Sequence, residues 1–139
     1  MDSIPRASMS SVGSEPSSRA FVRRFDALSN EDVPLVGGKN ASLGEMIGTL
    51  KSEGIRVPDG FATTADAYWH YLEANDLKDE MWAQLEALAD GDQSLSDTGA
   101  TIRKRIRTGT MPDDLADAVL SAYHDLSAGY DDDAIDVAA

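Results

Sequence analysis

The sequence contains no cysteine, few basic residues and no long apolar run, and each absence excludes a class of protein. Without cysteine, these 139 residues can form no disulfide, no thiolate nucleophile and no cysteine-ligated metal site. No apolar run approaches the roughly 18 residues that a membrane span requires, and residues 1–20 lack the apolar core of a secretory signal. We therefore expect a cytoplasmic protein with no membrane association.

Positive charge is scarce as well. The chain has 12 basic residues against 25 acidic ones, so its formal net charge is −13. Because nucleic-acid backbones attract cationic surfaces, this balance argues against nucleic acid as a partner. We interpret the acidic surface as suited to a high-salt cytoplasm, where ions screen the repulsion between carboxylates. An ordinary acidic protein is the alternative.

The composition that remains is enough for one folded domain. With 139 residues and a hydrophobic fraction of 42%, the chain has the length and composition of a globular protein. Residues 1–18 are rich in serine and proline, which predicts a disordered lead-in. We expect a helix-rich α/β fold with a small sheet over residues 19–139.

The folded part is predicted to begin with a strand and then a helix, and a glycine pair precedes the helix. The pattern predicts a strand over about residues 20–28, and Gly37 and Gly38 precede the helix. The predicted buried stripe of that helix has the spacing i, i+3, i+4, i+7 and consists of Leu43, Met46, Ile47 and Leu50.

Local signals set the ends of this helix. Ser42 and Glu45 match a capping box, and Asn40 is an alternative N-cap. Gly54 is placed where a helix commonly ends in a C′ glycine.

Residues 55–64 predict two short strands around a Pro-Asp-Gly turn, after which Thr63 or Thr64 caps a helix. The face that this helix buries is predicted to consist of Ala65, Tyr68, Trp69 and Leu72. A further helix is expected over about residues 78–89, followed by a loop at residues 90–99.

Two helices are predicted in the last part of the chain. The first is short and buries Ile102 and Ile106, and the second opens at Pro112 with Asp113 and Asp114 in its first turn. The buried face of the second is predicted to be Leu115, Val119, Ala122, Tyr123 and Leu126.

The C-terminal stretch alternates as a strand does, with Ile135 and Val137 as its inward residues. We expect the sheet to continue from this strand in a longer chain. The preceding run of Asp131, Asp132 and Asp133 lacks the spacing and the glycine of a calcium loop, which favours a solvated loop.

Lys39 is the candidate for a binding role. It follows the flexible pair Gly37-Gly38 at a helix start, where unpaired N–H groups and the helix dipole favour an anion. The nucleotide P-loop pattern G-x-x-x-x-G-K-[ST] is not met, because Asn40 follows the lysine. From spacing alone, a phosphate contact and a solvent-facing lysine in a tight turn both remain open.

Other chemistry-bearing residues favour structural roles. The basic cluster of Arg103, Arg105 and Arg107 is expected to form a solvated helix face that offsets nearby carboxylates. His70 and His124 have no carboxylate or serine at a catalytic spacing. An aromatic group with helical spacing is predicted to lie in the core and comprises Tyr68, Trp69, Tyr71 and Trp82. We assign no catalytic residue and no metal ligand within this chain.

Two sequence blocks resemble a known family. "VGGKNASLGEMI" and, shortly after, "GIRVPDGFATTADAY" are similar to the N-terminal start of the pyruvate phosphate dikinase family, and most of all to its phosphoenolpyruvate synthases (pyruvate, water dikinases). The resemblance covers about residues 21–137 and is strongest over residues 36–68. Rifamycin phosphotransferases share the same opening more loosely.

The resemblance implies the first subdomain of an ATP-grasp nucleotide-binding domain, with residues 19–139 forming its N-terminal part. It implies that Lys39 reaches the ATP phosphates and that Gly37 and Gly38 form the adjoining turn. The implied reaction converts ATP, pyruvate and water to phosphoenolpyruvate, AMP and phosphate, with Mg²⁺ and a phosphohistidine on a separate domain.

The family pattern also predicts what this polypeptide lacks. An Arg-Ser-Ser-Ala block that binds ATP follows the family's counterpart of residues 136–138, and the metal-binding and pyruvate-binding parts lie beyond it. We therefore expect the chain to be inactive alone, either as a truncated gene product or as one piece of a split enzyme whose second chain carries the rest. The alternatives are a non-catalytic interaction module and the start of a related dikinase or antibiotic phosphotransferase.

Overall fold

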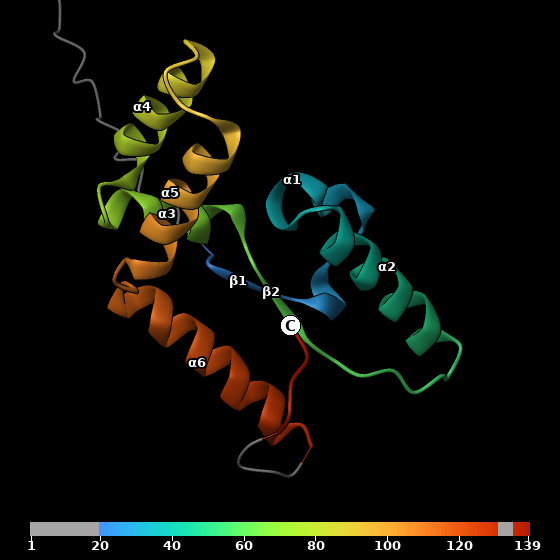
Figure 1. Ribbon diagram of the computed structural model, residues 1–139. Helices are drawn as coiled ribbons and strands as arrows, with labels where there is room; N and C mark the ends of the chain where they lie inside the picture. Colours follow the sequence, from blue (N-terminus) through green and yellow to red (C-terminus); the bar gives the residue numbers. More distant parts are fainter. Residues whose placement is uncertain (1–19, 131–134) are drawn as a thin grey trace, which may run out of the picture.

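The computed structural model describes residues 20–130 and 135–139 (Figure 1). The predicted lead-in at 1–18 and the run at 131–133 lie outside the described residues. The elements follow in the order β1 (Val22–Arg24), η1 (Phe25–Ala27), η2 (Asn30–Asp32), α1 (Val33–Val36), α2 (Gly38–Ser52), β2 (Phe61–Thr63), α3 (Ala65–Ala74), α4 (Leu77–Ala89), α5 (Leu95–Thr108) and α6 (Asp113–Ala128). Helices dominate and one pair of short strands lies among them, which confirms the helix-rich α/β prediction.

The two strands pair antiparallel, with Arg23 opposite Ala62 at the centre of the ladder. The prediction of a strand over residues 20–28 was wrong in its length, because the chain turns into the 3₁₀ helix η1 at Phe25. There the N–H of Phe25 donates to the carbonyl of Gly60 at 3.0 Å, which is the last cross-strand hydrogen bond before the turn.

Only one of the two strands predicted within residues 55–64 is present, since residues 55–60 form no strand. Pro58 has no N–H to donate to a ladder. The N–H of Asp59 instead donates to the phenol oxygen of Tyr130 at 3.0 Å. The segment before β2 is therefore tied to the end of α6 rather than to a neighbouring strand.

Helix α2 starts earlier than its capping box predicted. It begins at Gly38, after Gly37 in a left-handed conformation with φ 81°. The predicted N-caps Ser42 and Asn40 lie inside the helix, and the Glu45 carboxylate accepts from the N–H of Asn30 at 3.1 Å. The box is absent because the glycine turn has already started the helix.

The C-terminus of α2 confirms the predicted C′ glycine. Gly54 has φ 76° and its N–H donates to the carbonyl of Lys51 at 3.0 Å. The N–H of Ile55 donates to the carbonyl of Leu50, also at 3.0 Å. This pair of bonds is the Schellman arrangement, which ends a helix at a residue with positive φ.

The buried face of α2 differs from the predicted stripe. Of the predicted stripe, Ile47 is buried, Leu43 and Leu50 are half-buried, and Met46 is 48% exposed. Ala41 and Gly44, which were not predicted, are buried as well. A Cβ on Gly44 would lie 2.5 Å from the Cβ of Leu28, so the helix packs through its small residues. The core cluster on this side consists of Leu28, Val36, Ala41 and Ala62, with Phe25 and Leu35 packed against it.

Short polar caps start α3 and α5. The hydroxyl of Thr64 accepts from the N–H of Ala67 at 3.3 Å, which confirms one of the two predicted caps for α3. Ser94 accepts from the N–H of Asp97 at 3.1 Å, so the loop predicted over residues 90–99 was wrong from Leu95 onward. A Ser-x-x-Asp signal therefore starts a helix within a stretch that was predicted to be a loop because its residues are mostly polar.

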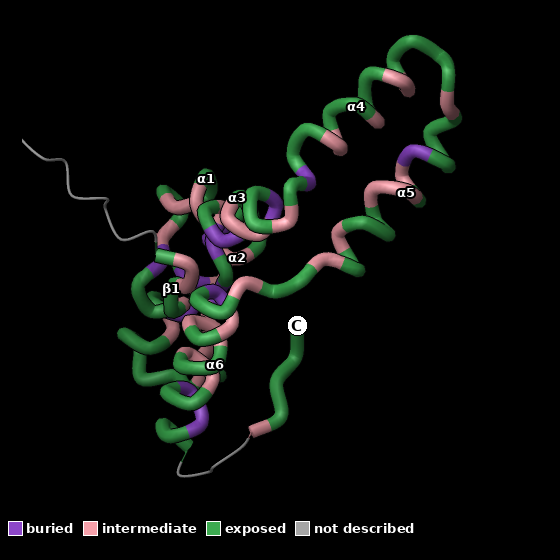
Figure 2. The backbone as a smooth tube through the Cα atoms, turned by 90° about the vertical axis from the view of Figure 1, so that its left-hand side faces the viewer, coloured by how far each residue is buried: buried purple, intermediate pink, exposed green. Residues whose placement is uncertain are grey.

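The predicted aromatic core was wrong. Tyr68 and Trp69 are 45% and 46% exposed, and Trp82 is 59% exposed. Tyr71 is half-buried, and helix α3 buries Leu72, as predicted, together with Ala67, because these residues face the neighbouring elements. Figure 2 shows α4 and α5 projecting together from the rest of the molecule, which leaves the outer side of α4 in solvent.

The last helices follow the prediction more closely. Helix α6 begins after Pro112, and Leu115 and Leu126 are buried on its predicted face while the other members are half-buried. On α5, Ile102 and Ile106 are half-buried rather than buried. None of the described helices combines the length and the apolar character needed to cross a membrane.

The predicted C-terminal strand is absent from the described residues 135–139. The carbonyl of Ile135 accepts from the phenol of Tyr123 at 2.9 Å, and Val137 is 61% exposed. The alternation of apolar residues was therefore not sufficient to form a strand, because this tail pairs with neither β1 nor β2.

Candidate functional site

The start of α2 presents a cation, the Lys39 ammonium, that has no partner within residues 20–130 and 135–139. The side chain of Lys39 is exposed and makes no hydrogen bond or ion pair with the residues that the structure describes. No side chain caps the helix at this end. An uncapped helix start offers free N–H groups and the positive end of the dipole beside the Lys39 ammonium.

The glycine pair keeps the space in front of this helix open. A Cβ on Gly37 or on Gly38 would meet no atom within 4 Å. At Gly37, φ 81° and ψ 161° also lie in a region that side chains disfavour. A ligand can therefore approach the backbone closely at the position where Lys39 projects.

Packing behind the turn holds it in place. The N–H of Gly37 donates to the carbonyl of Val33 at 2.9 Å, and the N–H of Ala41 donates to the carbonyl of Gly37 at 3.1 Å. The amide of Asn40 donates to the carbonyl of Val36 at 3.0 Å. Because Val36 and Ala41 belong to the core, Lys39 projects from a fixed backbone.

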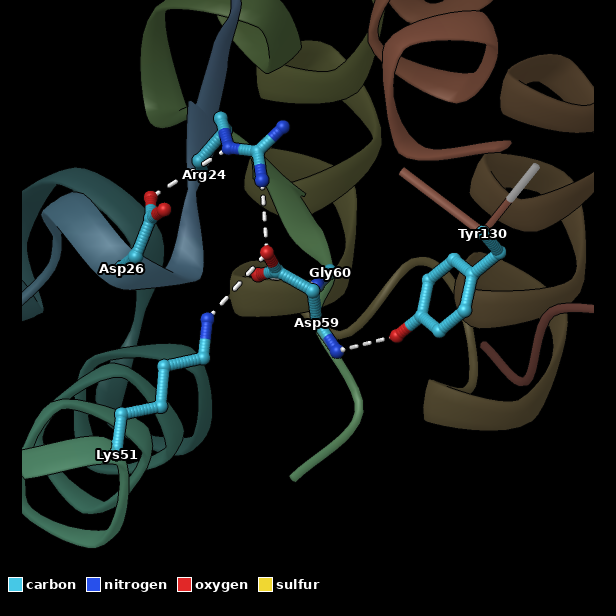
Figure 3. Close-up of polar contacts among 6 residues, drawn as sticks. All are labelled: Arg24, Asp26, Lys51, Asp59, Gly60 and Tyr130. Carbon is cyan, nitrogen blue, oxygen red and sulfur yellow. Dashed lines mark hydrogen bonds and ion pairs between the residues drawn. The ribbon is translucent and has the colours of Figure 1, made fainter. Parts of the chain in front are cut away.

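A second polar cluster lies around Asp59 (Figure 3). Its carboxylate accepts from the guanidinium of Arg24 at 2.7 Å and from the ammonium of Lys51 at 3.4 Å. The N–H of Gly60 donates to its other oxygen at 2.9 Å. The cluster thus links β1, the end of α2 and the segment before β2.

The electrostatics of this cluster are balanced within the protein. Partial burial alone would raise the pKa of Asp59, but the Gly60 N–H, Lys51 and Arg24 outweigh it and hold that pKa below its usual value. Since the charges of Lys51 and Arg24 already meet a carboxylate, the cluster has a structural role. No sequence pattern indicates this cluster, because Arg24 lies 35 residues from Asp59.

A cavity of about 640 Å³ lies beside this cluster. Apolar side chains including Phe25, Leu126 and Tyr130 line it, together with the tail at residues 135–139. None of Gly37, Gly38 and Lys39 lies on its wall, so the cavity and the start of α2 are separate features.

The two histidines take no catalytic arrangement. The Nε2 of His70 lies 2.8 Å from a carboxylate oxygen of Asp114, and its ring stacks on Phe21 with centroids 4.8 Å apart. This bond holds the pKa of Asp114 below its usual value. No sequence pattern indicates the contact between His70 and Asp114, because they lie 44 positions apart. His124 is exposed, beside the ring of Tyr123.

The basic cluster behaves as predicted at Arg105, whose guanidinium binds both carboxylate oxygens of Glu80 at 2.7 to 2.9 Å. This contact raises the pKa of Arg105. Among the described residues, no group of three or more histidine, aspartate or glutamate side chains is arranged to hold a metal ion.

Comparison with known proteins identifies the matched region. Residues 33–139 match the family described as pyruvate phosphate dikinase, AMP/ATP-binding domain. The chain is 43% identical over 122 residues to a phosphoenolpyruvate synthase of Aquifex aeolicus, covering 87% of this chain and 14% of that protein.

Two further relatives agree with this match. The phosphoenolpyruvate synthase of Pseudomonas aeruginosa is 44% identical over 118 residues, which cover 84% of this chain and 15% of the relative. That of Escherichia coli is 40% identical over 121 residues, covering 86% of this chain and 15% of the relative.

These matches confirm the resemblance seen in the two sequence blocks. The matched region begins before Gly37 and includes the start of α2, Lys51 and Asp59, and all the helices that follow, whereas Arg24 lies before it. The chain spans about 15% of the length of these relatives. It belongs to the pyruvate phosphate dikinase family of AMP/ATP-binding domains.

Proposed function

We propose that this chain supplies one wall of the ATP site of a phosphoenolpyruvate synthase and that Lys39 binds the ATP phosphates. The observation that carries the proposal is the ammonium of Lys39, unpaired among the residues that the structure describes, at an uncapped helix start inside the family match. Lys51, at the other end of α2, already pairs with the carboxylate of Asp59.

The chemistry of the site suits a phosphate group. Lys39 provides a point charge, the first N–H groups of α2 provide directed donors, and Gly37 and Gly38 leave room for close approach. In phosphoryl transfer, negative charge spreads over the phosphate oxygens, so fixed positive partners lower the barrier. Lys39 would act as one such partner.

Magnesium is expected with ATP from the family resemblance, yet the described residues do not fit a protein-held metal ion, since they offer no suitable group of acidic or histidine ligands. We therefore assign no metal ligand among the described residues.

The remainder of the reaction belongs to parts outside this chain. We propose that a second polypeptide completes the ATP site, binds pyruvate and carries the phosphohistidine, so that ATP, pyruvate and water yield phosphoenolpyruvate, AMP and phosphate. The chain alone then holds an incomplete site and neither binds ATP tightly nor turns it over.

Complementation tests the role of Lys39. The chain is mixed with a polypeptide that carries the remaining portion of a homologous synthase, and pyruvate-dependent release of AMP is measured. Lys39→Ala should reduce the rate about 10- to 100-fold, the loss expected for a charged hydrogen bond of about 1.5–3 kcal/mol. The matched control is Lys104→Ala, which removes another exposed lysine and should leave the rate unchanged.

Two results would contradict the proposal. Equal rates for the two lysine variants would remove Lys39 from the site. Calorimetric binding of ATP to the isolated chain at micromolar affinity would show that the half-site is sufficient by itself, against the proposed need for a second chain.

A further inference from the structure

An exposed aromatic surface runs along the outer side of the α3–α4 segment. We define this arm face as Tyr68, Trp69, Lys78, Trp82 and Leu85. Its four apolar members are between 41% and 59% exposed. Soluble proteins seldom leave large aromatic side chains clustered in solvent, and clusters of this kind mark interaction sites.

The members of the arm face adjoin one another. The rings of Tyr68 and Trp69 meet edge to face with centroids 5.7 Å apart. The ammonium of Lys78 lies 5.8 Å from the centroid of Trp69 and carries the surface from α3 to α4. Trp82 and Leu85 then follow Lys78 at i+4 and i+7, so the surface continues along one side of α4.

The rest of the described chain leaves this side of α4 uncovered. The adjoining side of the helix buries Leu77 and half-buries Met81 and Leu88. The principal neighbours of α4 are α5 and α3. Figure 2 shows α4 and α5 projecting away from the remaining helices, so the α4 part of the arm face lies apart from α1, α2 and α6.

The charges around the arm face are mostly negative. Trp82 lies between the exposed carboxylates of Asp79, three residues before it, and Glu86, four residues after it. The segment at residues 65–92 carries eight acidic side chains and a single lysine. A second copy of this chain, with a net charge of −13, would bring the same acidic surface against it.

We propose that the arm face is a docking surface for an amphipathic, lysine- or arginine-rich helix of another polypeptide. The partner helix would place apolar side chains against Trp69, Trp82 and Leu85 and cations beside Asp79 and Glu86. A helical partner suits a surface that is itself the ridge of a helix, since ridges of one helix pack into the grooves of another. This surface is distinct from the start of α2.

Fluorescence anisotropy with the full chain tests the proposal. The probe is a labelled synthetic helix with leucine along one face and lysine on its flanks, and a control peptide has glutamate in place of each lysine. The lysine peptide should bind at least about tenfold more tightly than the glutamate peptide, and added salt should weaken it.

Variants of the chain locate the binding surface. Trp82→Ala should weaken binding of the lysine peptide about tenfold or more, as loss of a central aromatic anchor does. Leu120→Ala, which truncates an exposed leucine of α6, should leave the affinity unchanged. Circular dichroism confirms that each variant is folded, which is expected because both side chains lie in solvent.

Four other outcomes would overturn the proposal. Absence of binding, or equal binding of the two peptides, would show that the arm face does not select a basic helix. Equal affinities for the two variants would place the binding elsewhere. A concentration-dependent dimer in sedimentation, lost in Trp82→Ala, would make a second copy the occupant.

Discussion

Three lysine side chains of this protein have different surroundings, and those surroundings decide their roles. Lys51 lies 3.4 Å from the Asp59 carboxylate, and Lys78 lies over the ring of Trp69. Lys39 meets neither an acid nor a ring among the described residues. A residue type therefore indicates what chemistry is available, while its neighbours in space determine whether that chemistry is free for a ligand.

Asp59 gives a prediction that depends on pH. Asp59→Asn should lower the free energy of unfolding by about 1–2 kcal/mol near neutral pH, because it removes charged hydrogen bonds that are partly screened. The pKa of Asp59 is lowered in the folded state, so the stabilisation is fully present above the unfolded pKa of about 3.9. It is lost as the pH falls through the folded pKa.

Urea unfolding of the wild type and the variant at a series of pH values measures this difference. Asp117→Asn, an exposed change on α6, is the control and should have little effect at any pH. A difference between wild type and Asp59→Asn that persists unchanged in strong acid would show that the carboxylate charge is not its origin.

At the scale of a single element, helix α2 contains two glycines, Gly44 and Gly48, whose surroundings differ. Gly44→Ala should destabilise the protein by about 1–3 kcal/mol, since the new Cβ would overlap Leu28 and two backbone carbonyl oxygens. Gly48→Ala, one turn later, meets no atom within 4 Å and should stabilise it by about 0.5–1 kcal/mol.

Thermal unfolding measures the change in stability of each of the two glycine-to-alanine variants. The opposite signs are the essential result, because both changes add the same methyl group to the same helix. If Gly44→Ala stabilised the protein as Gly48→Ala does, the close packing of α2 on η1 would be refuted.

Element ends were predictable where a local signal sets them. Gly54 ends α2, Thr64 caps α3 and Pro112 precedes α6, each through bonds within a few residues. The buried faces were less predictable, because Trp69 and Met46 have the right spacing but their burial depends on which neighbour packs against the helix. Helical periodicity shows which residues share a side, not whether that side is covered.

For the candidate site as well, features that depend on neighbouring residues were predictable, whereas contacts between residues far apart in the sequence were not. Lys39 was found from the glycine pair, the helix start and the family resemblance, all of which are local in sequence. The contacts of Arg24 with Asp59 and of His70 with Asp114 join residues 35 and 44 positions apart, so no spacing rule indicates them. The open space before Gly37 and the lack of a partner for Lys39 required coordinates.

The charge of the whole molecule leads to a prediction about salt. A net charge of −13 on a chain of this size destabilises the folded state through repulsion between carboxylates. Raising potassium chloride from about 0.1 M to about 1 M shortens the screening length from about 10 Å to about 3 Å. We expect the free energy of unfolding to rise by roughly 1 kcal/mol, which raises the melting temperature by roughly 4 °C.

A charge-reduced variant separates this effect from the general influence of salt on apolar surface. Glu53→Gln, Asp117→Asn and Asp125→Asn together remove three exposed negative charges from α2's end and α6. The variant should melt higher than the wild type at low salt and gain less from added salt, because less repulsion is left to screen. Equal gains for the two proteins would assign the salt effect to apolar burial, and the high-salt interpretation of the acidic surface would then fail.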